Sequence, residues 1–257
     1  MIVIGGISTA VVLLVALSLA TLTQVPESHA NPFWTLTHPA TPTALATATE
    51  IPTATAIPPT PTATESEVFQ RLYSTVTTNQ QATVSYSFLS NDGNNTAWEQ
   101  TPYGGHQCSF NPPPYHIETF QIGYAYFCYG DPNTSFANFI YTVRTNVVHG
   151  DGSSVFVRGS KEFQDFFRLD VGIDGNYFYF IGSQRGNGFS PAIHTGRNVD
   201  NVIGVIAQGT RIALFVNRKL LEVVSDTVRT DGTIGVGALA NTENAYVNFT
   251  YAQIWQL

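Results

Sequence analysis

The segment from Trp98 to Gly130 carries the residue types best suited to ligand recognition. Its sequence, WEQTPYGGHQCSFNPPPYHIETFQIGYAYFCYG, mixes tyrosine and tryptophan with glycine and proline. Sugars present flat C–H faces that stack on aromatic rings, and a tyrosine hydroxyl can fix the orientation of the sugar. We therefore predict a carbohydrate-binding platform in this segment. The candidate contact residues are Trp98, Tyr103, Tyr115 and Tyr129.

The same segment has a second interpretation, which the sequence leaves open. Tyr124, Tyr126 and Cys128 share one side of an alternating strand, so some of the rings can simply fill the core. Cys108 and Cys128 are the two cysteines of the chain, and one disulfide is their simplest interpretation if the compartment is oxidising. Such a bridge would stabilise the fold by about 3 kcal/mol.

Histidines and cysteines give no further chemical pattern. Neither cysteine has another histidine or cysteine at the short spacings of a structural zinc site. A histidine-centred nucleophilic site would need a fold that brings a nucleophile and a carboxylate together, and the sequence cannot show this. The histidines occur singly at positions 29, 38, 106, 116, 149 and 194.

The charge of the chain excludes one class of partner. The net charge is −7 and the 11 lysines and arginines are scattered, so no basic patch is available to follow a phosphate backbone. We therefore expect no nucleic acid partner.

Short apolar runs punctuated by turn residues begin at Ser66 and indicate an all-β domain. A short first helix over Ser66–Ser74 is the exception that we expect. Asp-Gly dipeptides, which accept the positive φ angles of hairpin turns, separate several of the runs. The alternating segments cover residues 82–89, 140–148, 166–173 and 202–207, and the dipeptides begin at residues 151, 174 and 231. So many short strands are typical of a β-sandwich.

The last segment, Arg211–Leu257, reads as two or three strands joined by tight polar turns. Asn217–Lys219 is the predicted turn of one hairpin, and Ile212–Val216 is apolar enough for a central strand covered on both faces. The chain ends on an apolar strand, and a frayed end would leave Trp255 in water. We therefore expect the C-terminus to be a structural member of a sheet.

The N-terminal quarter does not resemble a folded domain. Residues 2–22 contain no charged side chain, and about 20 apolar residues suffice to cross a bilayer. We predict that residues 1–23 form a transmembrane anchor; the alternative is a signal peptide cleaved near Ala30, after which the protein would be secreted. Residues 24–65 are rich in Thr, Pro and Ala, which predicts a disordered stalk. Residues 66–257 then form an extracellular domain on a single-pass membrane protein.

A family resemblance supports the same architecture. It is carried by NFIYTVRTNVVHGDGSSVFVRG, FFRLDVGIDGNYFYFIG, the segment from SPAIHTG to GTIGVGA, and VNFTYAQIW. In this order the motifs resemble concanavalin A-like jelly-roll domains of the laminin G and glucanase type, most of all the bacterial branch near the 3-keto-disaccharide hydrolase and family 16 glycoside hydrolase-like domains. The resemblance covers Cys108–Leu257. The final strand of this sequence departs from the family pattern at Thr250-Tyr251, where relatives often carry Asp-Asn.

The resemblance implies two kinds of site. An active retaining glucanase of this fold would carry Glu-x-Asp-x-x-Glu along one strand, since acid and nucleophile must lie about 5 Å apart. This chain lacks that motif, and its nearest cluster, Glu162, Asp165 and Asp170, begins in a polar loop. Laminin G-type domains often hold Ca²⁺ through loop oxygens. The loop residues available for this are Asp131, Asn133, Asp200 and Asn201.

The sequence therefore predicts a membrane-tethered, extracellular β-sandwich that binds a glycan or another extracellular ligand without catalysis. No catalytic residue and no cofactor is assigned, with Ca²⁺ as the one ion that the resemblance suggests. The alternatives are a glycoside hydrolase-like enzyme of the 3-keto-disaccharide hydrolase type and a spacer or adhesion module.

Overall fold

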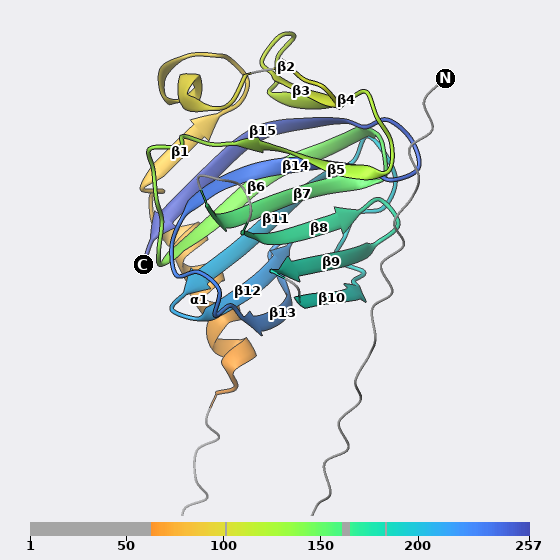
Figure 1. Cartoon of the computed structure of the whole chain (residues 1–257). Coiled ribbons are helices and arrows are strands. Elements are labelled where there is room, and N and C mark those ends of the chain that lie inside the picture. Colours follow the sequence, from red (N-terminus) through yellow and green to blue (C-terminus); the bar gives the residue numbers. More distant parts are fainter. Residues whose placement is uncertain (1–62, 101, 161–164, 183) are drawn as a thin grey trace, which may run out of the picture. The chain divides into compact units, whose positions relative to one another are not determined.

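Two antiparallel sheets packed face to face make up most of the folded chain (Figure 1). The computed structural model describes residues 63–100, 102–160, 165–182 and 184–257. The predicted membrane anchor and nearly all of the predicted stalk lie outside these residues. None of the helices in the described ranges combines the length and the apolar character needed to cross a membrane.

The larger sheet, here sheet A, contains nine strands. In the order in which they are hydrogen-bonded, its strands are β13 (Lys219–Ser225), β12 (Arg211–Val216), β11 (Asp200–Gln208), β6 (Phe139–His149), β15 (Tyr246–Gln256), β4 (His116–Thr119), β3 (His106–Ser109) and β2 (Pro102–Tyr103). The ninth strand, β1 (Val84–Ser87), pairs with the far half of β15. A short 3-10 helix, Gly93–Ala97, follows β1.

The smaller sheet, sheet B, contains six strands, and four of them follow one another along the chain. Its strands are β10 (Gln184–Phe189), β9 (Asn176–Ile181), β8 (Phe167–Gly172), β7 (Gly152–Gly159), β14 (Thr233–Ala240) and β5 (Tyr124–Tyr129). All of the neighbouring pairs are antiparallel. The all-β sandwich predicted from the alternating segments is confirmed, and each predicted segment overlaps a strand, although only four of the residues 82–89 form β1.

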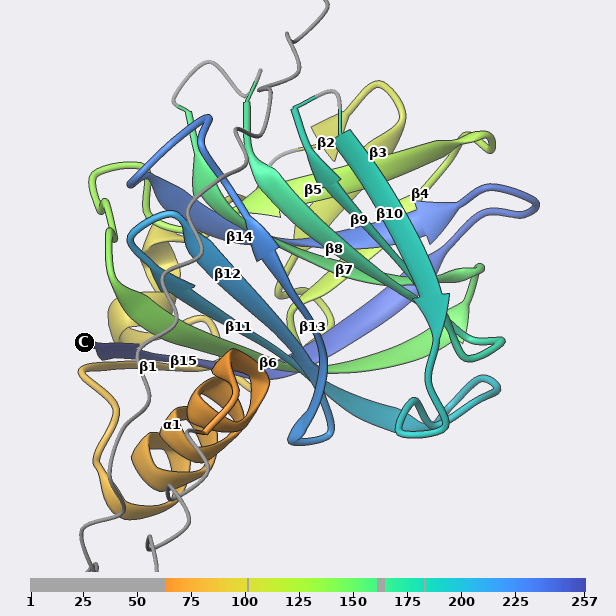
Figure 2. The same ribbon diagram turned by 90° about the horizontal axis from the view of Figure 1, so that it is seen from below.

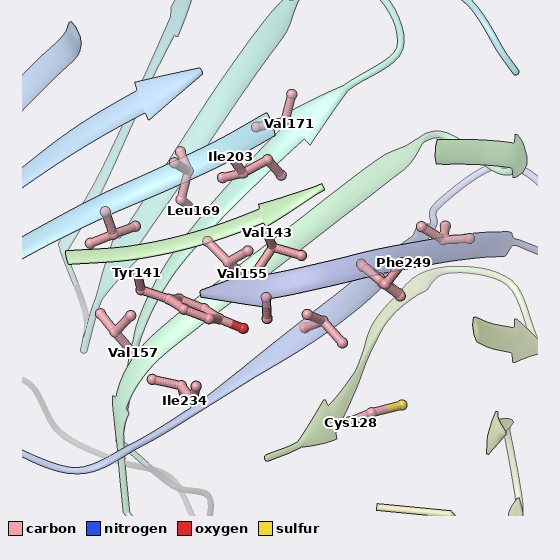
Figure 3. Close-up of a cluster of buried hydrophobic side chains, with 14 of the residues drawn as sticks. Cys128, Tyr141, Val143, Val155, Val157, Leu169, Val171, Ile203, Ile234 and Phe249 are labelled. Carbon is pink, nitrogen blue, oxygen red and sulfur yellow. The ribbon is translucent and has the colours of Figure 1, made fainter. Parts of the chain in front are cut away.

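The core lies between the two sheets. Tyr141, Val155 and Leu169 come from β6, β7 and β8 and point toward one another there (Figure 3), and all three are buried. Alternation puts every second side chain of these strands in this layer. The remaining side chains of sheets A and B lie on what we call their outer faces, turned away from the other sheet.

A helix covers part of the outer face of sheet A (Figure 2). This helix, α1, spans Glu65–Asn79, longer at both ends than the expected Ser66–Ser74. It begins with a capping box, in which the Thr64 and Glu67 side chains each accept a hydrogen bond from the backbone N–H of the other. The capping signal explains why the helix begins before the predicted boundary. Its buried side chains pack on Phe215 and Trp255 of sheet A.

The C-terminal segment forms four strands, one more than the upper estimate from the sequence. Its last strand, β15, lies between β6 and β4 inside sheet A, so the C-terminus is a structural member as predicted. Val216 pairs with Lys219, so the hairpin turn consists of Asn217 and Arg218 and is one residue shorter than predicted. Strand β12 is covered on both faces, because Leu214 faces the core while Phe215 faces α1.

A disulfide and a buried ion pair are among the links that hold the sheets together. The predicted disulfide between Cys108 and Cys128 is present, and it joins β3 of sheet A to β5 of sheet B. The second link was not predicted: Arg158 of sheet B is fully buried and forms an ion pair with Asp226 at 3.4 Å. Its guanidinium also donates hydrogen bonds to the backbone oxygens of Ala137, Gly209 and Arg229.

Candidate functional site

The structure distributes the four predicted sugar-contact residues over different environments. Trp98 and Tyr115 are buried, with exposed fractions of 2% and 0%. Tyr129 is half-buried on the outer face of sheet B, where its ring centroid lies 4.8 Å from that of Phe156. The backbone of Tyr103 lies in β2, and its side chain is outside the described part.

Trp98 and Tyr115 are core residues, which corrects the expectation that they offer their faces to a sugar. The two rings meet edge to face with centroids 5.7 Å apart, and both also pack against Phe88. The Tyr115 hydroxyl donates to the backbone oxygen of Glu99 at 2.7 Å. These contacts enclose both rings, so the second interpretation of the segment applies to them.

The outer face of sheet B instead brings together aromatic and polar side chains from six strands, a grouping that was not predicted. In register across the sheet, Phe127, Gly237, Ser154, Asp170, Phe178 and Asn187 form one row. The next row consists of Tyr129, Gly235, Phe156, Arg168, Phe180 and Arg185. Each strand contributes every second residue, and cross-strand neighbours in such rows have Cβ atoms roughly 5 Å apart.

A buried polar group occupies the middle of this face. Asp170 accepts a hydrogen bond from the Ser154 hydroxyl at 2.6 Å and forms an ion pair with Arg168 at 2.8 Å. Both Ser154 and Asp170 are buried. Burial raises the pKa of the Asp170 carboxyl, although Arg168 and Ser154 act in the opposite direction. The carboxylate is therefore held in one position by two charge-assisted contacts.

Aromatic rings surround the polar group. The guanidinium carbon of Arg168 lies 3.9 Å from the centroid of Phe180 and 5.4 Å from that of Phe127, which are cation–π distances. Phe156 packs against Phe127, Tyr129 and Phe166 on the other side. Gly235 makes this possible, because a Cβ there would come within 2.1 Å of the Phe156 ring.

The open part of the outer face lies at the β9–β10 edge. We call Phe178, Phe180, Arg185 and Asn187 the β9–β10 shelf. Phe178 is 44% exposed and pairs in register with the exposed Asn187; Phe180 is half-buried and pairs with the exposed Arg185. A groove of about 430 Å³ runs between this edge and strand β13 of sheet A, and of the shelf residues Arg185 lines it; its other lining residues are Tyr179, Ile181, Gln184, Val224 and Ser225. Aromatic faces thus lie beside amide and guanidinium groups, the combination that sugar recognition requires.

The carboxylates of this face do not form a glycosidase pair. Among the described strand residues of the outer face of sheet B, Asp170 is the sole carboxylate. Both mechanisms of common glycosidases require two carboxyl groups, about 5 to 9.5 Å apart. Of the cluster noted in the sequence, Asp165 lies in an exposed segment before β8, and Glu162 is outside the described part.

The residues considered for Ca²⁺ lie in two separate segments and already have partners. Asp131 accepts a hydrogen bond from the Asn133 backbone N–H at 2.8 Å, as in a simple turn. Asp200, at the start of β11, pairs with Arg144 at 3.2 Å, and Asn201 accepts from the His194 backbone. His106 lies near Cys108 and Cys128, whose sulfurs are joined in the disulfide. A calcium site stays a prediction.

Comparison with known proteins identifies the fold. No model of a protein family matches the sequence, and no curated protein matches it. Among solved structures, a Bacillus subtilis protein of unknown function with a galectin-like fold matches with a TM-score of 0.50 and 14% identity, over 68% of this chain and 97% of that one. The Crh5 transglycosylase matches in its apo form with a TM-score of 0.52 and 12% identity, over 68% and 85% of the two chains. Its complex with NAG gives a TM-score of 0.52 at 12% identity, over 68% and 84%.

The described domain is a concanavalin A-like β-sandwich. Galectin-like and transglycosylase structures share its two-sheet architecture, which confirms the fold that the sequence motifs implied. Identities of this size show the fold alone.

Sequence reasoning missed Ser154, Arg168, Phe178 and Phe180 as a group, although a signal for them exists. Arg168 and Asp170 alternate in FFRLDVG, and Phe178 and Phe180 alternate in NYFYFIG. Each pair therefore shares a face of its strand. What the sequence does not contain is the register that sets one pair beside the other.

Proposed function

We propose that the protein is an exported, membrane-tethered module that binds a glycan on the β9–β10 shelf of sheet B without catalysis. The observation that carries the proposal is the exposed ring of Phe178 beside the side-chain amide of Asn187. A sugar ring stacked on Phe178 would place its hydroxyls within reach of Asn187 and Arg185. On the neighbouring strand β8, Arg168 is held by its ion pair with Asp170 and stacks on the Phe180 ring, which keeps that ring in position.

Two further observations support this proposal. A structure of the same fold was solved in complex with NAG, which makes a saccharide a reasonable first ligand to test. The apolar N-terminal residues 2–22 and the stalk rich in Thr and Pro support export and display outside the membrane. Secretion after cleavage near Ala30 is the alternative location.

A glycan array tests the proposal with two matched variants. We expect the purified full chain to bind one class of glycan. Phe178→Ala should weaken that binding by about tenfold or more, because a stacked aromatic contributes roughly 1.5 kcal/mol or more. Phe120→Ala is the control, since Phe120 is 50% exposed but lies in the loop between β4 and β5. Silence of the wild-type chain across the array would contradict glycan binding and favour a spacer or adhesion module.

One observation favours an enzyme as the second candidate. A buried carboxyl whose pKa is raised, as in Asp170, is suited to donate a proton to a leaving group. A hydrolase would have to supply its second carboxylate from outside the described strand residues of this face. Hydrolysis of a disaccharide or 3-keto-disaccharide by the wild-type chain, abolished in Asp170→Asn with the fold intact, would replace the binding proposal by this one.

A further inference from the structure

A second pocket lies on the opposite side of the molecule from the β9–β10 shelf, between α1 and the outer face of sheet A. Its volume is about 240 Å³. Its lining includes Tyr73, Thr142, Arg218, Tyr251, Gln253 and Trp255. We call this space the α1 pocket. It is smaller than the roughly 300–1,000 Å³ of pockets for drug-sized ligands, so it suits a single small ring.

The inner wall of the α1 pocket is rigid. The Tyr73 ring stacks on Phe215 with centroids 4.1 Å apart and an interplanar angle of 12°. Its hydroxyl end lies over Gly204 of β11, where a Cβ would come within 2.5 Å of the hydroxyl oxygen. On the other side the Trp255 indole N–H donates to the backbone oxygen of Gln80 at 3.1 Å, which fixes the indole ring.

Four polar groups of the pocket form no hydrogen bond or ion pair with the residues that the structure describes. They are the hydroxyls of Tyr73, Thr142 and Tyr251 and the guanidinium of Arg218. Tyr73 and Thr142 are only 1% and 4% exposed. Although both residues are buried overall, neither hydroxyl oxygen is among the fully enclosed, unsatisfied side-chain atoms of the described residues. Both oxygens therefore open into the pocket, where a bound ligand can replace water as their hydrogen-bond partner.

Arg218 brings a positive charge to the rim by an unusual local structure. It is the second residue of the two-residue β12–β13 turn, with φ of +67°, after Asn217 with φ of +49°. The second position of such a turn favours glycine. Asn217 stabilises the turn by accepting a hydrogen bond from the Val202 N–H and donating one to Ala192. The Arg218 side chain is exposed and makes no comparable structural contact, so its guanidinium is available to a ligand at the rim.

The charge balance of the pocket favours an anion. Both tyrosine hydroxyls lie near enough to Arg218 for its charge to oppose the rise in pKa that burial causes. The nearby carboxylate of Asp200 is already engaged by Arg144 and by the Asn146 amide. An acidic ligand would therefore meet an uncompensated guanidinium in a protein whose net charge is −7.

We propose that the α1 pocket binds one acidic sugar unit, a six-membered hydroxylated ring that carries a single carboxylate. The carboxylate pairs with the Arg218 guanidinium, which matches its geometry in a two-point contact. The hydroxyls of Tyr73, Thr142 and Tyr251 hydrogen-bond the ring hydroxyls. The amide oxygen of Gln253 can accept from one of them, while its nitrogen donates to the Ser85 hydroxyl at 3.2 Å. This site is independent of the β9–β10 shelf, and its ligand class differs from a neutral glycan.

The test is a titration of the purified full chain with glucuronate, galacturonate and N-acetylneuraminate, followed by calorimetry. Glucose and inorganic phosphate are the comparison probes. We expect saturable binding of at least one acidic sugar in the millimolar range or tighter, and much weaker binding of glucose and of phosphate. Equal binding of phosphate would mean a simple anion site, and equal binding of glucose would mean that the charge is irrelevant; either result overturns the proposal.

Three variants locate the site. Arg218→Gly removes the guanidinium and leaves an Asn-Gly turn, which is favoured, so the fold should be as stable as the wild type or more so. We expect its Kd to rise about tenfold to hundredfold, as for the loss of charge-assisted hydrogen bonds. Tyr73→Phe deletes one hydroxyl and should weaken binding several-fold. Arg71→Gln removes an exposed charge of α1 that does not line the pocket, and it should bind as the wild type does.

The outcomes separate this proposal from the one for sheet B. No binding of any acidic sugar by the wild type, or an unchanged Kd in Arg218→Gly, would overturn the α1 pocket proposal. Neither result bears on the β9–β10 shelf, which is tested by Phe178→Ala on the array.

Discussion

At the scale of single residues, the aromatic side chains divide into enclosed and exposed sets. Trp98 and Tyr115 are enclosed by other rings, whereas Phe178 is 44% exposed. Aromatic composition alone does not distinguish a binding ring from a core ring, because both bury large apolar area in the bound or folded state. Only the position of each ring relative to the sheets assigns its role.

Substitution of a core ring should therefore reduce stability. We expect Trp98→Ala to lower the free energy of unfolding by about 3–5 kcal/mol, the usual cost of removing a buried large aromatic. Urea denaturation followed by circular dichroism measures this. A loss below about 1 kcal/mol would contradict the buried position, because surface substitutions usually change stability by no more than ~0.5 kcal/mol.

Asp170 should make stability depend on pH. Because burial raises its pKa in the folded state, the folded protein holds this proton more tightly than the unfolded chain does. The contribution of Asp170 to the free energy of unfolding therefore falls as pH rises from the ordinary Asp pKa of about 3.9 through the raised pKa of the folded state. Above the raised pKa this contribution is constant. Asp170→Asn does not titrate at this position.

The measurement is the difference in unfolding free energy between wild type and Asp170→Asn, determined from pH 3.5 to 8. We expect the wild type to lose stability relative to the variant as pH rises through the acidic range. A relative gain with rising pH would mean that Arg168 and Ser154 outweigh burial and lower the pKa of Asp170.

At the scale of elements, α1 is the part whose boundary depends on a local signal. The reciprocal hydrogen bonds of Thr64 and Glu67 begin the helix at Glu65. Thr64→Ala should therefore destabilise α1 by about 1 kcal/mol and increase hydrogen exchange of its first-turn amides. Thr78→Ala, at an exposed position near the end of the same helix, is the control and should leave those amides unchanged. Equal exchange in both variants would contradict the capping role.

Much of this architecture could be predicted from the sequence, and the site could not. Period-2 alternation in segments such as 140–148 is a local property, so the strands β6, β8 and β11 follow from it. The pairing of Phe178 with Asn187, or of Ser154 with Asp170, depends on register between segments. Register is decided by the whole sheet and is not written in either segment. The burial of Trp98 could not be predicted either, because Trp98 follows a 3-10 helix and lies in no strand, so no periodic pattern marks it as buried.

At the scale of the whole molecule, a disulfide, a buried ion pair and side-chain hydrogen bonds join the two sheets. The Cys108–Cys128 disulfide connects β3 to β5 and closes a loop with a sequence separation of 20. Replacing both cysteines by serine should lower the free energy of unfolding by about 3 kcal/mol through the greater freedom of the unfolded chain. Urea denaturation of the double variant beside the oxidised wild type checks this, and equal midpoints would contradict a stabilising bridge.

The two outer faces of the sandwich offer different chemistry. The β9–β10 shelf on sheet B combines Phe178 and Phe180 with Arg185 and Asn187, while the α1 pocket on sheet A combines hydroxyls with the single guanidinium of Arg218. A tether through residues 1–23 would display both faces outside the membrane.

The most direct test of glycan binding by sheet B is a map of the contact surface. The strongest glycan from the array is titrated into ¹⁵N-labelled protein, and the backbone amide shifts are followed by NMR. We expect the largest shifts to cluster in β9 and β10, residues 176–189. Shifts that cluster instead in the Trp98–Tyr129 segment, or that leave β9 and β10 unchanged, would contradict the assignment of the site.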